Sequence, residues 1–448
     1  MDVLLLSRIQ FALTIAFHYI YPPLSIGLGI LLVIMEGMYL KTRNPLYHQM
    51  TRFWVKIFGL TFAIGVATGI VMEFEFGTNW ATYSRYVGDV FGSALAAEGI
   101  FAFFLESGFL AVLLFGWDKV SPAVHFFSTV MVCLGAHFSS IWIVVAGSWM
   151  QTPAGYHIVG EGMSARAEIT DFWAMVFNPS SMDRLAHVVL GCWQAGAMLV
   201  LSISAYYLLQ RKYEEFARAS MKIALFLALF ASLAQLASGH SSAKLAAKYQ
   251  PAKLAAMEGH FEESAPAALY LFGRPDEKNE QMTGGIQVPG MVSFLIHEDT
   301  KAPVQGLKAF RKEDRPPVNI VFYSFHLMIV VGMFLIALNV LGFVLLLQGR
   351  LFSARPILWI YVFAVLGPQI ANQTGWITAE VGRQPWIVYG LLRTSEALSK
   401  TVTASMVLTS LIMFSVIYVL LFVLFIYLLD SKIRQGPDQA DELQPHRA

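Results

Sequence analysis

The chain alternates long apolar stretches with short polar connections. About nine stretches have the roughly 20 mostly apolar residues that a helix needs to cross a lipid bilayer. Their approximate limits are residues 10–40, 53–76, 93–116, 122–147, 185–209, 221–239, 320–348, 357–379 and 401–429. We therefore predict an all-α integral membrane protein with about nine transmembrane helices. The Pro22-Pro23 pair predicts a kink or an interruption in the first helix.

Polar segments divide this pattern into four parts. Residues 1–239 hold the first six predicted membrane helices, and residues 318–430 hold the last three. Between them, residues 240–317 are polar and charged and too long for a simple connection, and such loops are usually functional or disordered. We expect the polar tail at residues 431–448 to be disordered. A shorter polar segment, residues 150–184, is expected to cap the outer face.

Basic residues indicate the orientation of the chain. They gather in the first, third, fifth and seventh connections and after the last stretch, whereas the short even-numbered connections hold few of them. Because cytoplasmic loops are enriched in Lys and Arg, we expect the N-terminus and the loop at 240–317 outside and the C-terminus in the cytoplasm. The basic residues are Lys41, Arg43, Arg52, Lys119, Arg211, Lys212, Arg218, Lys222, Arg350, Arg355, Lys432 and Arg434.

The composition agrees with a location in a membrane. Hydrophobic residues make up 56% and charged residues 14% of the chain, whereas soluble domains contain about 25% charged residues. The net charge of +1 excludes the basic footprint of a nucleic-acid-binding protein. Cys133 and Cys192 lie inside apolar stretches, so we expect two small buried side chains rather than a disulfide.

Two histidines lie within predicted membrane helices, where ionisable side chains are costly and usually functional. His18 lies in the middle of the first helix, and a neutral imidazole at that depth requires a metal or a hydrogen-bond partner. His187 lies at the outer end of the fifth helix, where it could bind a haem iron with the haem carboxylates at the aqueous edge. The alternatives are a satisfied core histidine for His18 and an interfacial histidine for His187.

Met328 lies early in the seventh stretch, which enters the membrane from the same side as the helix of His187. A His–Met pair gives a six-coordinate, low-spin haem, as in electron-transfer cytochromes. Methionine more often fills gaps in a core. His326 is an alternative ligand, but residues two apart point to different faces of a helix, so only one of the two can serve a given haem.

Glu98 and Glu106 are the only charged residues between Phe91 and Trp117. In an α-helix, eight residues make little more than two turns, so both carboxylates are expected on nearly one face, about 12 Å apart along the axis. Two carboxylates on one face of a membrane helix indicate a proton path, or a metal ligand with a relay behind it. The alternative is a pair of structural acids.

The run that begins at Glu380 places an acid and a cation at a membrane boundary. Glu380 closes an apolar stretch, and Arg383 follows within a Gly-Arg-Gln-Pro-Trp turn. Trp376 lies one turn before Glu380, where its indole could bridge two haem planes or anchor the helix at the interface. Arg383, and Arg8 near the outer mouth of the first helix, could bind carboxylates such as haem propionates through bidentate hydrogen bonds.

A short helix is predicted in the long outer loop, where Lys253 and Glu258 flank the apolar sequence Leu-Ala-Ala-Met. A substrate such as a quinol needs a base for its hydroxyl proton and an apolar slot for its ring. The two residues are therefore candidates for a quinol site. The alternative is an exposed amphipathic helix with solvated charges.

Five stretches together resemble subunit I of the cytochrome bd quinol oxidases, the large haem-bearing subunit. The similarity runs along nearly the whole chain, and chance agreement at all five stretches is negligible. The stretches are residues 7–14 (SRIQFALT), 72–80 (MEFEFGTNW), 98–107 (EGIFAFFLES), 253–258 (KLAAME) and 382–386 (GRQPW).

The resemblance implies three haems: a low-spin haem b, a high-spin haem b and a haem d. It implies that His187 and Met328 ligate the low-spin haem. It also implies that His18 and Glu380 ligate the two high-spin haems, without saying which residue serves which haem.

The resemblance assigns further roles. Glu98 would lie at the oxygen-reducing haem as a ligand or a proton donor, with Glu106 behind it on the proton route. Trp376 would stand between the haems. Lys253 and Glu258 would belong to the quinol site.

The function implied by the resemblance is that of a terminal respiratory oxidase. Quinol would give up electrons and protons at the outer side, and O2 would become water with protons drawn from inside, so that charge separates without a pump. The expected partners are a subunit II of homologous fold, a small single-helix subunit as a further candidate, ubiquinol or menaquinol, O2 and the lipid bilayer, with no nucleic acid. The expected location is the bacterial cytoplasmic (inner) membrane, which the chain crosses several times.

Two features depart from the family pattern. His326 stands where the family commonly has Arg, which weakens the fixed positive charge near the low-spin haem. The outer loop is of the short type.

Two other classes of protein also suit buried Glu and His residues. A membrane b-type cytochrome of a quinone-linked dehydrogenase would use His–His pairs and would need no intramembrane Glu ligand. A haem-free proton-coupled transporter usually has paired repeats, and none is evident in this sequence.

Overall fold

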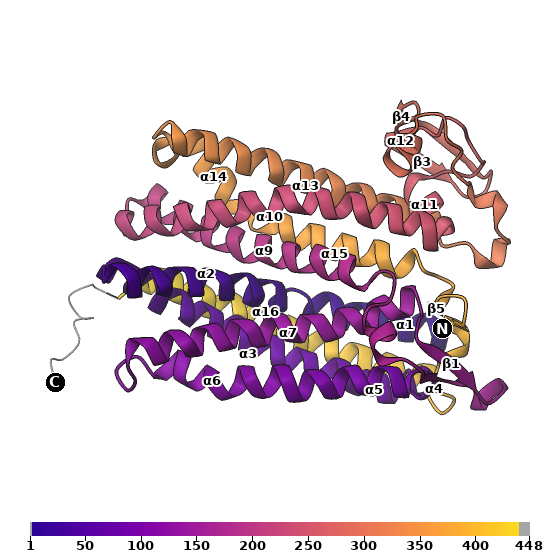
Figure 1. Cartoon of the computed structure of the whole chain (residues 1–448), viewed down its shortest axis with the longest axis horizontal. Coiled ribbons are helices and arrows are strands. Elements are labelled where there is room, and N and C mark those ends of the chain that lie inside the picture. Colours follow the sequence, from indigo (N-terminus) through magenta and orange to yellow (C-terminus); the bar gives the residue numbers. More distant parts are fainter. Residues whose placement is uncertain (1, 439–448) are drawn as a thin grey trace.

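The long apolar stretches form helices that pack side by side, with their ends at two opposite faces of the molecule (Figure 1). The computed structural model describes residues 2–438, without the side chains of residues 101–103 and 163. Eight helical segments within the described residues are long and apolar enough to cross a membrane. The long helices are α1 (Val3–His18), α2 (Tyr21–Thr42), α3 (Pro45–Thr78), α7 (Pro122–Gln151), α9 (Ser181–Gln210), α10 (Glu214–Tyr249), α13 (Val318–Leu347), α15 (Leu366–Val381) and α16 (Ala404–Gln435).

The first predicted span is interrupted as its proline pair predicts. α1 ends at His18, and α2 begins at Tyr21 with prolines in its first turn. Proline is tolerated there because the first N–H groups of a helix have no partner within the helix. His18 therefore lies at a helix end inside the bundle.

The predicted span at residues 357–379 is not one helix. It forms α14 (Arg355–Ala364) and α15, which meet at Val365. Pro368 cannot donate a hydrogen bond to the carbonyl four residues earlier, at Ala364, which is where α14 ends. The eight long segments do not include this broken pair, so the predicted number of nine crossings stays a prediction, as does the direction in which the chain is inserted.

The third span also departs from a regular α-helix. α5 (Gly88–Ala97) and α6 (Phe104–Phe115) are joined by a π-helical turn, Glu98–Phe103. The expected spacing of Glu98 and Glu106 on a continuous α-helix is therefore wrong in its detail. Such π-helical turns are rare and frequently occur at functional sites.

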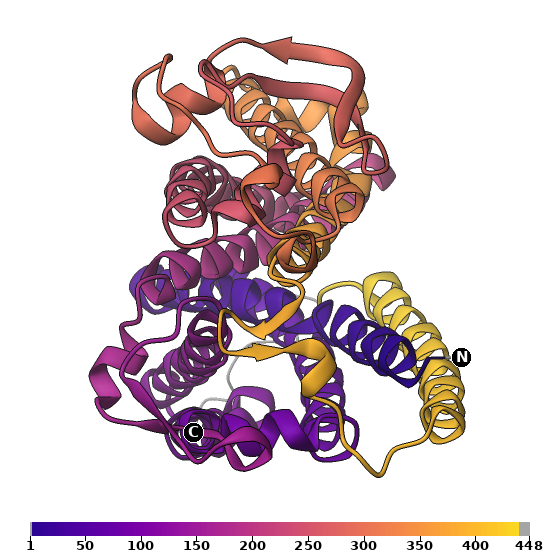
Figure 2. The same cartoon turned by 90° about the vertical axis from the view of Figure 1, so that its right-hand side faces the viewer.

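The longer connecting segments gather at the end of the bundle where α1 begins (Figure 1). They carry three antiparallel hairpins, so the all-α prediction holds for the bundle and not for these segments. The end view places β3–β4 beside the end of α13, and β1–β2 over the helices of the first half of the chain (Figure 2). The strands are β1 (Tyr156–Val159), β2 (Arg166–Ile169), β3 (Leu269–Asp276), β4 (Gln281–Val288), β5 (Trp386–Val388) and β6 (Leu392–Arg393).

The predicted long loop is partly helical. α10 continues ten residues past its expected end at 239 and stops at Tyr249. The predicted short helix forms as α11 (Pro251–Glu258), and α12 (Met291–His297) follows the β3–β4 hairpin. The segment at 150–184 contains α8 (Phe172–Val176), and α4 (Ala81–Tyr86) lies near it at the same end of the bundle.

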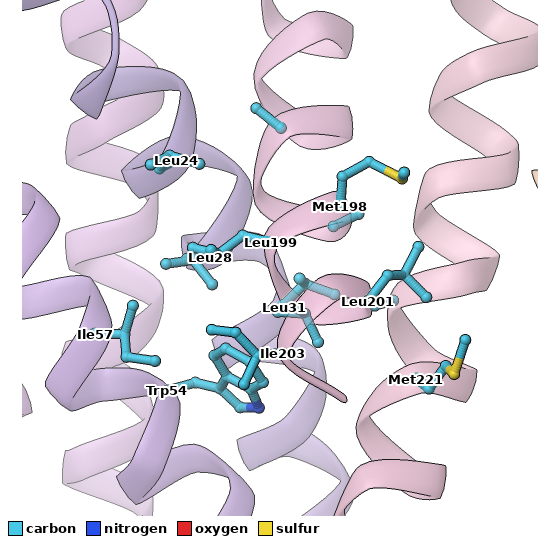
Figure 3. Close-up of a cluster of buried hydrophobic side chains, with 14 of the residues drawn as sticks. Leu24, Leu28, Leu31, Trp54, Ile57, Met198, Leu199, Leu201, Ile203 and Met221 are labelled. Atoms are coloured by element: carbon cyan, nitrogen blue, oxygen red, sulfur yellow. The ribbon is translucent and has the colours of Figure 1, made fainter. Parts of the chain in front are cut away.

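The centre of the bundle is apolar and closely packed. Side chains of α2, α3, α9 and α10 meet there (Figure 3). Glycines bring α2 and α9 into backbone contact, because a Cβ on Gly196 would lie only 2.4 Å from the carbonyl carbon of Gly27. Small residues of this kind are typical of helix packing in membranes. Leu28, Leu31, Trp54, Met198 and Met221 are fully buried in this core.

The C-terminal tail is helical where it begins. α16 continues to Gln435, and Asp438 forms an ion pair of 2.8 Å with Lys56 of α3. The expected disorder is therefore wrong for residues 431–438, and residues 439–448 lie outside the described part of the chain. Cys133 and Cys192 are buried and unpaired, as predicted.

Candidate functional site

Glu380 and Arg383 form an ion pair at the end of α15. The second carboxylate oxygen of Glu380 accepts a hydrogen bond of 3.1 Å from Nε2 of Gln151, the last residue of α7. Arg383 is only 3% exposed, and its Nε and Nη1 have no hydrogen-bond partner among the described residues. Buried N–H groups without partners are rare, so this guanidinium is suited to receive a further anion.

Gln151 also contacts Lys253, the candidate quinol-binding residue of the outer loop. The Nζ of Lys253 donates a hydrogen bond of 2.5 Å to Oε1 of Gln151. Gln250 donates another, of 2.8 Å, to the backbone carbonyl of Gln151. A Cβ on Gly382 would lie 2.9 Å from Cγ of Lys253, so the turn after α15 packs directly against this lysine. The structure thus brings together Lys253, Glu380 and Arg383, which lie far apart in the sequence.

The electrostatics of this cluster favour bound anions. Burial holds the pKa of Lys253 well below its usual value, and the nearby Arg184 and Arg383 lower it further, whereas Glu380 opposes them. Three cations therefore face one carboxylate. Sequence reasoning assigned no role to Arg184 or Gln151. The only signal in the sequence for a role of Arg184 is its position one turn before His187.

Glu258 is also buried, with 5% of its surface exposed. Its Oε2 has no partner among the described residues, and burial raises the pKa of the carboxyl group to about 8. α11 and the turn that follows it pack against α13 through Met257 and Phe261. The alternative of a solvated amphipathic helix is therefore wrong for both Lys253 and Glu258.

His187 faces α10. Its Nδ1 lies 2.8 Å from Oγ of Ser238, and its Nε2 lies 3.0 Å from the amide nitrogen of Gln235. Because Ser238 donates its own hydrogen to the carbonyl of Gln235, it accepts from Nδ1. The amide nitrogen can only donate, so Nε2 carries the lone pair. This is the tautomer that an iron-ligating imidazole needs.

Met328 lies at the same level of the bundle as His187. A Cβ on Gly375 of α15 would lie 2.8 Å from the sulfur of Met328. One turn earlier on α15, Asn372 contacts Gly191, which lies one turn after His187 on α9. The helices that carry the two predicted ligands therefore pack against the same segment of α15. The amide nitrogen of Asn372 and Oε1 of Gln235, near His187, are both buried, and neither has a hydrogen-bond partner in the part of the chain that the structure describes.

His326 is not placed as a metal ligand. Its Nδ1 lies 2.9 Å from the carbonyl oxygen of Phe322, and its Nε2 lies 2.7 Å from that of Tyr270 in β3. Both ring nitrogens are therefore occupied by backbone acceptors. Of the two alternatives in the sequence, this favours Met328.

His18 packs against α3. Its Nδ1 lies 2.9 Å from Oγ1 of Thr68, and a Cβ on Gly69 would lie 3.3 Å from its Cε1. The contact with Thr68 fixes the ring through Nδ1, which leaves Nε2 as the nitrogen for a metal. His18 thus has the polar partner that the alternative of a core histidine also requires.

Glu98 and Glu106 face the same side of α7. The hydroxyl of Ser139 donates a hydrogen bond of 2.5 Å to Glu98, and a Cβ on Gly135 would lie 2.9 Å from Cβ of Glu106. Gly135 and Ser139 are one turn apart on α7, so the two acids are neighbours despite the π-helical turn between them. Ser139 was not predicted from the sequence.

Arg8 and Trp376 lie apart from these contacts. Arg8 is exposed and lines a pocket of about 520 Å³ with Gln384 and with loop residues such as Arg315. It makes no hydrogen bond or ion pair with any described residue. Trp376 is half-buried on α15, directly after the glycine that contacts Met328.

Comparison with known proteins places this arrangement in a family. A family model described as cytochrome bd terminal oxidase subunit I matches residues 6–437. The chain belongs to this family. Membership excludes the quinone-linked dehydrogenase cytochrome and the transporter, and it makes the protein a multi-pass membrane subunit of a terminal oxidase that works with a partner subunit.

Relatives cover the chain from end to end. The cytochrome bd ubiquinol oxidase subunit 1 of Bacillus subtilis (strain 168) is 39% identical, over 98% of this chain and 95% of that protein. The cytochrome bd-II ubiquinol oxidase subunit 1 of Escherichia coli (strain K12) is 35% identical, over 99% of both. The solved bd oxidase of Geobacillus thermodenitrificans superposes with a TM-score of 0.90 at 30% identity, over 97% of this chain and 99% of that one.

A cytochrome carries haem, and the described residues suit one. A histidine nitrogen and a methionine sulfur, as in His187 and Met328, are the ligands typical of a low-spin haem. The unpartnered polar atoms of Gln235 and Asn372 lie near these two residues. Near Glu380, the unpartnered guanidinium nitrogens of Arg383 suit a propionate.

Proposed function

We propose that this oxidase subunit oxidises a membrane quinol at its outer end and reduces O2 to water within the membrane, with a low-spin haem b, a high-spin haem b and a haem d. The observation that carries the proposal is the contact through Gln151 between Lys253 of the outer loop and Glu380 of α15. It joins a candidate substrate-binding group to a candidate iron ligand, as electron transfer from quinol to haem requires.

Lys253 and Glu258 bind the quinol head group. The free Oε2 of Glu258 accepts the hydroxyl proton, and its pKa of about 8 keeps that proton exchangeable near neutral pH. Lys253, whose pKa burial lowers, fixes the opposite oxygen of the head group. The apolar surface of Met257 and Phe261 suits the ring. Both ubiquinol and menaquinol fit this chemistry.

The proposed iron ligands are the residues whose surroundings suit haem, as described above. Haem, when bound, supplies the iron that carries electrons from the quinol and reduces oxygen. His187 and Met328 hold the low-spin haem b, and Ser238 keeps His187 in the ligating tautomer. His18 and Glu380 hold the two high-spin haems.

The buried cations compensate the charge of the haem propionates. Arg383 and Arg184 lie beside Glu380 in a net positive cluster. Arg8 approaches from the outer mouth of α1, where it also borders the outer loop. Trp376 follows the glycine that contacts Met328 and lies one turn before Glu380 on α15, so its indole would stand between the haems.

Protons for water formation come from the inner side. Glu106 passes them to Glu98, and Ser139 holds the Glu98 carboxylate toward α7. Glu98 also qualifies as a ligand of the oxygen-reducing haem. Protons leave the quinol outside and are taken up inside, so the reaction generates a proton motive force by charge separation without pumping.

The subunit acts within a larger complex. We propose a subunit II of homologous fold, together with a small single-helix subunit, as its partners in the bacterial cytoplasmic membrane. Large apolar side chains exposed along α13 and α16 suit contact with lipid or with such helices.

Substitution in the outer loop tests the quinol site. Glu258→Ala is expected to lower quinol oxidation by about 100-fold, as loss of a general base does, while oxygen reduction with an artificial electron donor continues. Glu262→Ala, four residues away and exposed, is the matched control. Equal loss of both activities in Glu258→Ala would contradict the assignment.

A further inference from the structure

Gln151 lies between two opposite charges. It is 1% exposed at the end of α7, and its amide has a fixed orientation. Oε1 accepts from the ammonium of Lys253 at 2.5 Å, whereas Nε2 donates to the carboxylate of Glu380 at 3.1 Å and to the carbonyl of Ala379 at 3.2 Å. The backbone carbonyl of Gln151 accepts from Gln250. Each polar group of the side chain is therefore used.

Only an amide satisfies both neighbours at once. A carboxylate at this position would pair with Lys253 but repel Glu380. An apolar side chain would leave the buried Lys253 and the half-buried Glu380 without this partner, and the two would then attract each other directly, although Glu380 would keep its ion pair with Arg383. Glu380 is already close enough for its charge to act on Lys253. The amide thus separates a cation and an anion that attract each other.

We propose that Gln151 is a positioning residue that keeps Lys253 directed to the quinol and Glu380 directed to its haem, so that one amide sets both sites. This inference rests on the proposed function of the two residues. It predicts that a change of charge at position 151 is felt at the haem and at the quinol site together, although Gln151 touches neither reacting atom.

Gln151→Glu tests the inference because it keeps the shape of the side chain and changes its charge. We expect a lower midpoint potential for the haem held by Glu380, since an added negative charge favours ferric iron. We also expect the KM for quinol to rise about tenfold, since Lys253 becomes held more tightly by the new carboxylate. Potentiometric titration followed by absorption measures the first effect, and steady-state oxygen uptake measures the second.

Two further variants complete the test. Gln151→Leu is expected to raise the KM in the same way, because Lys253 then pairs with Glu380. Gln49→Glu makes the same chemical change at the other end of the bundle, beside Asp438, and should leave both quantities unchanged.

The outcomes separate this inference from the proposed function. If Gln151→Glu keeps its haems and its turnover with an unchanged potential and an unchanged KM, the inference is wrong while the oxidase function stands. If the unsubstituted complex contains no haem, the proposed function itself fails.

Discussion

His326 joins the outer loop to the helix of Met328, since its Nε2 lies 2.7 Å from the carbonyl oxygen of Tyr270 in β3. The ring also packs on Phe322, with ring centroids 3.9 Å apart. The β3–β4 hairpin is therefore hydrogen-bonded to α13 at a position two residues before Met328, a proposed haem ligand. The structure therefore gives this histidine a role in holding the loop.

Replacement of this side chain should loosen the loop without removing a haem. His326→Leu leaves the carbonyl of Tyr270 without its donor, which costs about 1 kcal/mol. We expect faster amide hydrogen exchange at residues 269–288 and an unchanged low-spin haem spectrum. Loss of the low-spin signal with an unchanged loop would instead identify His326 as the ligand.

Met328→Leu should abolish the low-spin haem b signal and keep the oxygen-binding bands. Leucine preserves the apolar volume against Gly375 but has no sulfur to bind iron. Reduced-minus-oxidised absorption spectra measure both signals. Met333→Leu, on the exposed side of the same helix, is the control and should retain the complete spectrum. A normal low-spin band in Met328→Leu would remove this residue from the ligand set.

The pKa of Glu258 predicts how quinol oxidation depends on pH. Burial raises this pKa from 4.5 to about 8, so the carboxyl group is protonated below pH 8 and cannot accept a proton from quinol there. The value of kcat/KM for quinol should therefore rise with pH until about 8 and then level off. Glu258→Gln should be slower and lack this inflection. The same inflection in that variant would assign the titration to another group.

The backbone contact between α2 and α9 predicts a stability effect. A Cβ on Gly27 would lie 2.3 Å from the carbonyl oxygen of Cys192, so Gly27→Ala must push the helices apart. We expect a destabilisation of about 1–3 kcal/mol, measured as a lower midpoint of thermal unfolding in detergent. Gly147→Ala, in α7 with no heavy atom within 4 Å of the new Cβ, should be neutral or slightly stabilising. Equal effects of the two substitutions would contradict the packing argument.

The hydrophobic pattern predicts most of this fold because each membrane helix must satisfy its own backbone. The break at Val365 lies inside an apolar stretch, and the pattern of apolar residues does not respond to Pro368. The types of residue in the π-helical turn after Ala97 likewise do not distinguish it from a regular α-helix. The extension of α10 to Tyr249 was missed because its last turns are polar where they leave the apolar layer.

In the candidate site, too, the sequence reveals some of the residues and only the structure reveals the others. His187 and Glu380 are recognisable because ionisable side chains are unusual inside a membrane. Met328 is an ordinary apolar residue, and only its depth relative to His187 and the family resemblance single it out. Gln151 and Ser139 are ordinary polar residues, and they matter only because α7 carries them to Glu380 and Glu98. The sequence also cannot reveal that Glu258 is buried, since its short helix looks amphipathic in isolation.

The central claim is that side chains within the membrane hold haem iron, and the absorption spectrum of the purified complex tests it most directly. We expect both b-type and d-type haem, with one group of bands lost in each of the single variants His18→Ala, His187→Ala and Glu380→Ala. A complex without porphyrin, or one in which all three variants keep every band, would contradict it.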